Sequence, residues 1–336
     1  MTDPKSTAAP AESGNPTMTM AAALNSAFHL AMEHNDKIVV LGEDVADPIG
    51  GVFKTSKGLS TKFGEQRVRA TPISEQAIAG AAVGLALGGY RPVAEIMFFD
   101  FITLAMDQIL NHAAKFRYMT GGTTPAPITV TTTIGSSHFG AQHAQSLEAW
   151  FMHTPGINVL YPATPSDAKG LIATALESPD PSLLIQHSGL LYSVKEPVPA
   201  GVHKIPLGVA NTVRAGSDVT LITYGTQLGV CLEAARTLAE SGVDAEVIDL
   251  RTLVPLDFAT VEASVERTRR AVVVHEATEF AGPGAEIAAR LNEKLFPELL
   301  APVTRLGAAF TPVPFSKSLS GYPTVDKVVA KVRGLF

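Results

Sequence analysis

Apolar residues recur along the first two thirds of the chain with two alternating spacings. Positions three or four residues apart, typical of helices with one buried face, recur in long segments that include 18–34, 101–119 and 166–178. Short continuous apolar runs, which predict buried strands, include 36–44, 91–98, 128–134 and 182–187. Because strands and helices alternate, the pattern predicts an α/β fold built on a parallel sheet.

Proline and charged residues interrupt this alternation after residue 192, and a second series of strands and helices follows. We therefore predict a first domain at 18–192, a linker at 193–205 and a smaller α/β domain at 206–336. Residues 1–17 are rich in proline, serine and alanine and have no apolar stretch, so they predict a disordered tail and not a signal peptide.

The composition narrows the classes of partner. Hydrophobic residues make up 46% of the 336 positions and charged residues 17%. This composition favours extensive burial of surface and is compatible with burial against a second chain. The net charge of −6, without a basic block, argues against nucleic acid and against an anionic membrane surface. No apolar run is long enough to span a membrane. The single cysteine, Cys231, excludes an internal disulfide and favours a reducing cytoplasm.

The segment 71-TPISEQAIAGAAVGLALGG-89 contains one ionisable side chain, that of Glu75. Thr71 or Ser74 can cap a helix here, and a carboxylate in its first turn would stabilise it by about 0.3–1 kcal/mol through the helix dipole. The residues that follow have no polar face, so we expect a helix buried on all sides. A carboxylate in such surroundings has one of two roles. It stabilises the start of the helix, or it binds a specific hydrogen-bond donor or carries a proton.

Two further clusters lie in predicted loops. His138 and His143 belong to the loop 138-HFGAQHAQ-145 after a strand, where α/β proteins place active-site groups, although loop histidines are often structural. Their spacing does not support zinc binding. Glu43, in 42-GEDV-45, either caps a turn or faces a ligand from the end of a strand.

The motifs that bind phosphate are missing. The sequence contains no GxGxxG after a strand, no GxxxxGK[ST] and no GDG…N segment for a metal and a diphosphate. It also lacks the GxSxG motif that presents a catalytic serine in α/β hydrolases. The residues by themselves therefore predict an α/β protein with a candidate carboxylate–histidine site and no means of its own to hold a phosphate group.

An ordered series of blocks along the chain resembles the β subunits of the decarboxylating component of 2-oxo acid dehydrogenase complexes, the pyruvate, branched-chain and acetoin enzymes. The resemblance covers residues from about 18 to the C-terminus and includes GEDV, GGVFKTSKG, TPISEQAIAG, RPVAEIMFFDF, AQHAQ, RTLVPLD and TPVPF. It implies a pyrimidine-binding domain of the transketolase type for thiamine diphosphate, followed by a transketolase-type C-terminal domain.

The resemblance also implies roles for two residues. Glu75 matches the glutamate that hydrogen-bonds N1′ of the coenzyme's aminopyrimidine ring, so that the ring can take up a proton from the thiazolium carbon. His143 matches the histidine that orients or protonates the reacting group and assists acyl transfer. The family usually has serine after this histidine, and this chain has Ala144, which removes one hydroxyl beside it.

Three more residues match positions that surround the coenzyme in the family. Phe101 matches the aromatic residue that packs on the aminopyrimidine, and Ile73 lies where the family contacts the same ring. Glu43 matches an acid that links the two active sites of the assembly through a water-filled tunnel. These residues are therefore expected to bind the coenzyme, and no metal ligand is expected in this chain.

The resemblance finally implies partners and a reaction. An α subunit would hold the diphosphate through Mg²⁺, and two α and two β chains would form a heterotetramer that docks on a lipoyl acyltransferase core. The expected reaction is oxidative decarboxylation of a 2-oxo acid, such as pyruvate or a branched-chain oxo acid, with acyl transfer to lipoamide. The alternatives are acetoin cleavage by an acetoin dehydrogenase β subunit, and a non-catalytic α/β interaction subunit that has kept only the fold.

Overall fold

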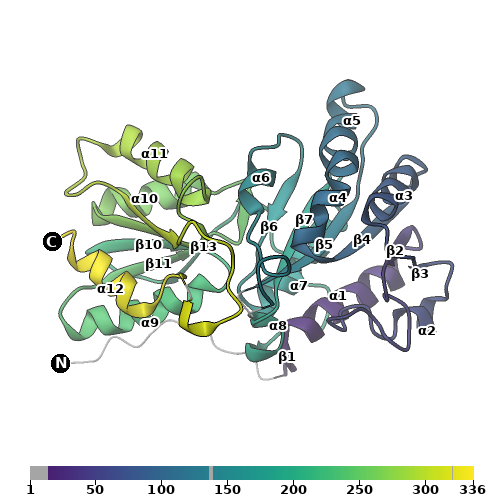
Figure 1. Ribbon diagram of the computed structural model, residues 1–336, viewed down its shortest axis with the longest axis horizontal. Coiled ribbons are helices and arrows are strands. Elements are labelled where there is room, and N and C mark those ends of the chain that lie inside the picture. The colour runs from purple at the N-terminus through teal and green to yellow at the C-terminus, as the bar shows by residue number, and fades with distance from the viewer. Residues whose placement is uncertain (1–13, 136–138, 320) are drawn as a thin grey trace.

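The computed structural model describes residues 14–135, 139–319 and 321–336. Two lobes lie side by side, each built on a sheet with helices against it (Figure 1). Most of the predicted tail, residues 1–13, and the candidate His138 lie outside the described residues. Within those residues, no helix combines the length and the apolar character needed to cross a membrane.

The first lobe contains a seven-stranded sheet of order β12-β6-β7-β5-β4-β2-β3, parallel except for β12. Its strands are β2 (Ile38–Gly42), β3 (Val68–Ala70), β4 (Arg91–Phe98), β5 (Thr129–Ile134), β6 (Asn158–Leu160), β7 (Ser182–His187) and β12 (Thr252–Val254). Its helices are α1 (Met20–His34), α2 (Leu59–Phe63), α3 (Glu75–Leu87), α4 (Ile102–Met106), α5 (Ala114–Met119), α6 (Glu148–Met152), α7 (Pro165–Ala175) and α8 (Leu190–Ser193).

Both faces of the central strands are buried, as a parallel sheet requires. Alternate residues point to opposite faces, so Val40 and Val93 belong to the core cluster that contains α1 and α7. Their neighbours Leu41 and Ala94 belong to the cluster that contains α3 and α4. This two-sided burial explains why the strands read as continuous apolar runs in the sequence.

The second lobe contains a five-stranded sheet of order β14-β13-β10-β11-β9, in which only the edge strand β9 runs antiparallel. Its strands are β9 (Asn211–Arg214), β10 (Val219–Thr223), β11 (Ala245–Asp249), β13 (Ala271–Thr278) and β14 (Thr304–Ala308). Its helices are α9 (Gln227–Glu240), α10 (Phe258–Thr268), α11 (Pro283–Leu295) and α12 (Val325–Arg333). The α/β expectation is confirmed in both lobes.

Several elements were not predicted. Strand β8 (Lys195–Pro197) lies within the predicted linker and pairs with β1 (Thr17–Thr19), which begins at the last residue of the predicted tail. These strands are three residues long, as is β12, so they leave no periodic signal in the sequence.

The expectation that α3 is buried on all sides is wrong for the single chain. Ile78, Ala82 and Ala86 face the sheet, whereas Ala77 and Ala81 on the opposite side are exposed. The sequence of α3 has no polar face, yet the single chain covers only one side of the helix. An exposed apolar face of this kind is compatible with contact to another chain.

The two lobes meet through a continuous core with buried polar contacts. Tyr161 and Tyr224, from opposite lobes, pack with ring centroids 5.3 Å apart, and Tyr224 donates to Glu148 Oε1 at 2.8 Å. His187 at the end of β7 pairs with Glu276 of β13 at 2.9 Å. Both side chains of this pair are almost fully buried, so the lobes are held in a specific orientation.

Candidate active site

The candidate residues follow neighbouring strands of the first sheet. Glu43 comes directly after β2, Glu75 follows β3, Phe101 follows β4, and His143 lies in the loop after β5. Because β3, β2, β4 and β5 are adjacent and parallel, their carboxyl ends share one edge of the sheet. Ligands of open α/β sheets bind at this edge, so the fold places the candidates where a ligand is expected.

Glu75 and Glu43 form the acidic part of this edge. Glu75 is the first residue of α3 and is 7% exposed. Ser74 occupies the cap position without a side-chain hydrogen bond, and Thr71 N donates to Gly42 O at 2.9 Å, which ties the start of α3 to β2. Burial raises the pKa of Glu43, and the charge of Glu75 raises it further. The two carboxyls therefore interact electrostatically.

No hydrogen bond or ion pair from a described residue reaches the carboxylate of Glu75. Its oxygens are not among the buried atoms without a partner, so they remain open to solvent and to a ligand that brings an N–H group. Glu75 stands at the N-terminus of α3, where backbone N–H groups without helical partners interact favourably with an acidic side chain. Glu75 is thus suited to accept a hydrogen bond from a ring nitrogen of a bound molecule.

Phe101 and His143 form the aromatic part. The imidazole of His143 meets Phe98 and Phe101 edge to face, with both ring centroids 5.2 Å away. Phe139, from the same loop as His143, packs on Phe98 with centroids 6.0 Å apart. The described residues offer no hydrogen bond to the His143 ring, so the rings fix its orientation and leave its nitrogens for a ligand.

Two residues that the sequence reasoning missed hold this loop. Asp100, next to Phe101, is buried and accepts from Gln145 Nε2 at 2.7 Å and from Gln145 N at 3.3 Å. The bonds connect the end of β4 to the residue two positions after His143. Ala144 between them is 1% exposed, so its methyl group fills a closed site in which a hydroxyl would need a partner.

Ile73 lies apart from these contacts. Its side chain is 81% exposed in the turn before α3, the largest exposure of any aliphatic residue named at this edge. The structure therefore places Ile73 two residues before Glu75, with most of its side chain open to solvent.

Glu95 of β4 is a further ionisable group that the sequence reasoning missed. It is 7% exposed, and burial raises its pKa to about 7, opposed only by a hydrogen bond from Thr55 Oγ1 at 3.4 Å. It pairs across the sheet with Gly42, the residue before Glu43. The signal in the sequence was a lone acid inside an apolar strand, and such groups cluster at functional sites.

The candidate side chains that the structure describes at this edge are acidic and aromatic, without a lysine or arginine among them. Within the described residues, no group of three or more His, Cys, Asp or Glu side chains could hold a metal ion. The acidic and aromatic side chains suit an aromatic ring with an N–H donor, and they do not suit a diphosphate.

Comparison with known families agrees with this geometry. Residues 16–193 match the model "Transketolase, pyrimidine binding domain", and residues 208–327 match "Transketolase, C-terminal domain". The chain is 43% identical to the pyruvate dehydrogenase E1 component subunit beta of Staphylococcus epidermidis, over 90% of this chain and 93% of the relative. It belongs to the family of dehydrogenase E1 β subunits.

Other members of the family are equally similar. The β subunit of acetoin:2,6-dichlorophenolindophenol oxidoreductase from Bacillus subtilis is 43% identical over 93% of this chain and 95% of its own. The pyruvate dehydrogenase E1 β subunit of the same organism is 42% identical over 90% of this chain and 93% of its own. Membership in this oxidoreductase family implies dependence on thiamine diphosphate, as the resemblance predicted.

A solved structure supports the fold. A split-gene transketolase, described as an inactive β4 tetramer, superposes with a TM-score of 0.77 at 24% identity and covers 95% of this chain and 98% of its own. At this identity the likeness concerns the fold alone.

Proposed function

We propose that this chain is the β subunit of a 2-oxo acid dehydrogenase and binds the aminopyrimidine half of thiamine diphosphate at Glu75. The observation that carries the proposal is the buried Glu75 carboxylate, which no described residue satisfies, at the sheet edge that also holds Phe101 and His143. An α subunit would supply the diphosphate grip through Mg²⁺, in an assembly of two α and two β chains in the cytoplasm.

The residues of this chain would act by position and by proton transfer. Glu75 would accept a hydrogen bond from the pyrimidine nitrogen, and charge-assisted bonds of this kind are about twice as strong as neutral ones. Phe101 would pack on the ring, with Ile73 covering it from the exposed turn. His143, held between Phe98 and Phe101, would exchange a proton with the substrate. Glu43 would belong to the water-filled tunnel that links the two active sites of the assembly.

The coenzyme, when bound, supplies the electron sink for the carbon from which CO₂ departs. The acyl group would then pass to lipoamide on an acyltransferase core. Acetoin cleavage is the second candidate reaction, because the acetoin enzyme of Bacillus subtilis is as similar to this chain as the pyruvate enzyme of Staphylococcus epidermidis is.

Coexpression with the α subunit tests this function. The purified complex should reduce 2,6-dichlorophenolindophenol with one of three substrate classes, namely pyruvate, branched-chain 2-oxo acids or acetoin. Glu75→Ala should lower the rate by at least about 10²–10⁴-fold while the tetramer stays intact, because the proton-transfer contribution is lost.

The matched control is Glu65→Ala, which removes an exposed carboxylate away from the site and should leave the rate unchanged. A complete complex without turnover on any of the three substrates would favour the non-catalytic reading. A Glu75→Ala complex with near-normal rates would contradict the role of Glu75.

A further inference from the structure

A cavity of about 290 Å³ lies where the two lobes meet. One wall comes from residues 145–147 before α6 and from Ala149 and Trp150 within it. The opposite walls come from the end of β13 and from residues 308–314, which begin at the last residue of β14. In Figure 1 this last segment runs along the junction between the lobes. The cavity is therefore built by both domains, and Glu43, Glu75, Phe101 and His143 are not among its lining residues.

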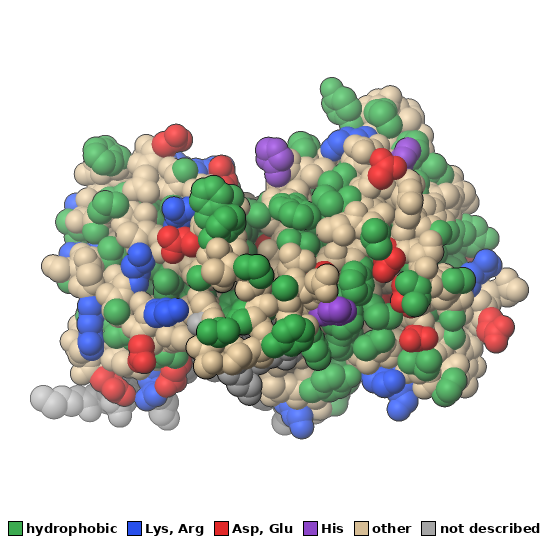
Figure 2. All heavy atoms as spheres, in the orientation of Figure 1, with side chains coloured by type: hydrophobic (Ala, Val, Ile, Leu, Met, Phe, Trp, Pro, Cys, Tyr) green, Lys and Arg blue, Asp and Glu red, His purple; other side chains and the backbone are tan. Residues whose placement is uncertain are grey.

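The rim of the cavity is aromatic and exposed. Phe280 and Phe310 pack edge to face at 5.0 Å, yet they are 68% and 73% exposed, and Trp150 is half exposed on the facing wall. Hydrophobic side chains gather along this junction in Figure 2. Pro312 and Pro314 restrict the backbone of the segment that carries Phe310, so little entropy is lost when a partner covers it.

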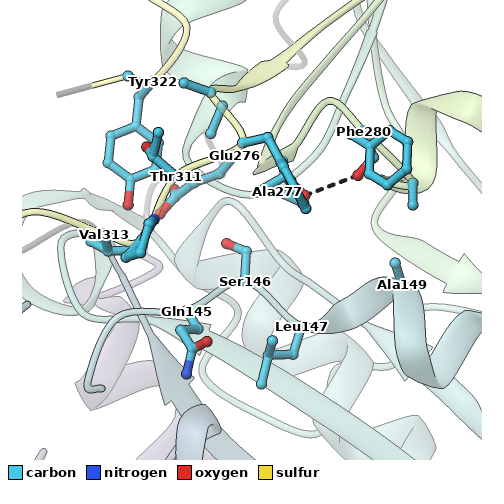
Figure 3. Close-up of a pocket in the computed structure, with 18 of the residues that line it drawn as sticks. Gln145, Ser146, Leu147, Ala149, Glu276, Ala277, Phe280, Thr311, Val313 and Tyr322 are labelled. Atoms are coloured by element: carbon cyan, nitrogen blue, oxygen red, sulfur yellow. Dashed lines mark hydrogen bonds between the residues drawn. The ribbon is translucent and has the colours of Figure 1, made fainter. Parts of the chain in front are cut away.

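Two hydroxyls inside the cavity lack partners. Ser146 Oγ and Tyr322 OH are buried atoms without a hydrogen bond in the described structure. Figure 3 shows the Ser146 hydroxyl pointing from the α6 wall into the cavity, toward the wall that holds Glu276. Glu276 is itself engaged by His187 and Thr226. An occupant with one hydrogen-bonding group beside an apolar body would satisfy these hydroxyls.

The cavity is continuous with the loop that carries His143. Gln145 and Ser146 line it, and Phe315 at the end of the rim segment lies on Gly140, where an added Cβ would be 2.3 Å from the ring. Whatever covers the rim therefore also covers the loop of the candidate active site. The chain that provides the missing diphosphate grip must approach the same region.

We propose that this cavity and its aromatic rim, formed by Trp150, Phe280 and Phe310, are the docking site for a side chain of the α subunit that has an apolar body and one hydrogen-bonding group. The inference rests on the proposed function, which requires such a partner. A second copy of this chain fits less well, because it would bring the same residues and again no grip for a diphosphate. Exposed aromatic residues around a desolvated pocket are the usual anchors of such interfaces.

Site-specific photo-crosslinking tests the proposal. A benzoylphenylalanine placed at position 310 of the chain, coexpressed with the α subunit, should crosslink to the α subunit on irradiation. The same group at position 296 is the matched control, because Phe296 is also a largely exposed phenylalanine of the second lobe but lies outside the cavity. Mass spectrometry of the products identifies the captured chain.

Charge substitution gives an independent measure. Phe310→Asp should weaken the α–β complex about 10- to 100-fold in Kd without changing the melting temperature of the isolated chain, whereas Phe296→Asp should leave the Kd unchanged. Capture of a second copy of this chain from position 310, or wild-type affinity in Phe310→Asp, would overturn the docking site. A complex that assembles normally but turns over none of the three substrates would refute the proposed function alone.

Discussion

Glu95 shows how a single buried carboxyl makes stability depend on pH. Its pKa is about 7 in the folded chain against 4.5 for the free group. Between these two pH values the folded state binds more protons than the unfolded state, so the free energy of unfolding falls as the pH rises. The cause is burial, since the hydrogen bond from Thr55 acts in the opposite direction.

Glu95→Gln removes this ionisation and keeps an acceptor for Thr55. The variant should gain stability relative to the wild type as the pH rises from 5 to 8, by up to ~3 kcal/mol for a shift of this size. Urea unfolding of both proteins at each pH measures the gain. Glu148 and Asp249 are also buried with pKa values of about 7. Their contributions cancel in the difference because both proteins contain them. An equal stability difference at both pH values would contradict this account of Glu95.

At the scale of elements, Gly156 sets how closely the loop before β6 approaches α5. Its φ is +99°, and an added Cβ would lie 2.0 Å from the carbonyl oxygen of Ala114. A backbone atom cannot move aside as a flexible side chain can. Gly156→Ala should therefore destabilise the chain by roughly 2–5 kcal/mol, from conformational strain and steric overlap together.

Gly64 provides the control for this prediction. Its φ is +81°, and an added Cβ would meet nothing within 4 Å, so Gly64→Ala carries the strain without the overlap. Its ψ of 161° combines with this φ in a region that side chains rarely adopt, so the strain should cost about 1–3 kcal/mol. Thermal or urea unfolding of the two variants separates the terms, and equal losses would mean that the contact with Ala114 is unimportant.

The long elements were predictable because their patterns are local. Strand β4 matches the predicted segment 91–98, and the helical run Phe99–Met119 corresponds to the predicted helix at 101–119, although the structure divides it into 3₁₀, α and π turns. Strand β12 was not predictable, since its three residues gain their pairing only when the second lobe folds back onto β6. Helix α12, beyond the last predicted strand, has a clear apolar stripe and was overlooked.

The candidate site was predictable in part for a similar reason. Glu75 stands out as one charge in an apolar helix, and the fold places it at the expected edge of the sheet. Asp100 and Glu95 were missed because their importance depends on burial and on contacts with residues distant in the chain. Such contacts follow from tertiary packing and leave no spacing signature in the sequence.

At the scale of the whole molecule, the candidate site has groups that suit the ring of the coenzyme and none that we assign to its diphosphate. The sheet edge holds acidic and aromatic groups that suit a ring, the described residues contain no metal cluster, and the exposed aromatic rim lies beside the loop of His143. Under the proposed function, these features explain why this chain would need an α subunit. They predict that the isolated chain binds thiamine diphosphate weakly and that the complex with its α subunit binds it well.

The most direct measurement is the rate of hydrogen–deuterium exchange at the thiazolium C2 of thiamine diphosphate, followed by NMR after acid quench. The complex of this chain with its α subunit should accelerate the exchange by about 10²–10⁴-fold over the same complex carrying Glu75→Gln. Coenzyme binding by both complexes is measured alongside, so that loss of binding is not mistaken for loss of catalysis. Equal exchange rates in the two coenzyme-loaded complexes would contradict the claim that Glu75 activates the coenzyme.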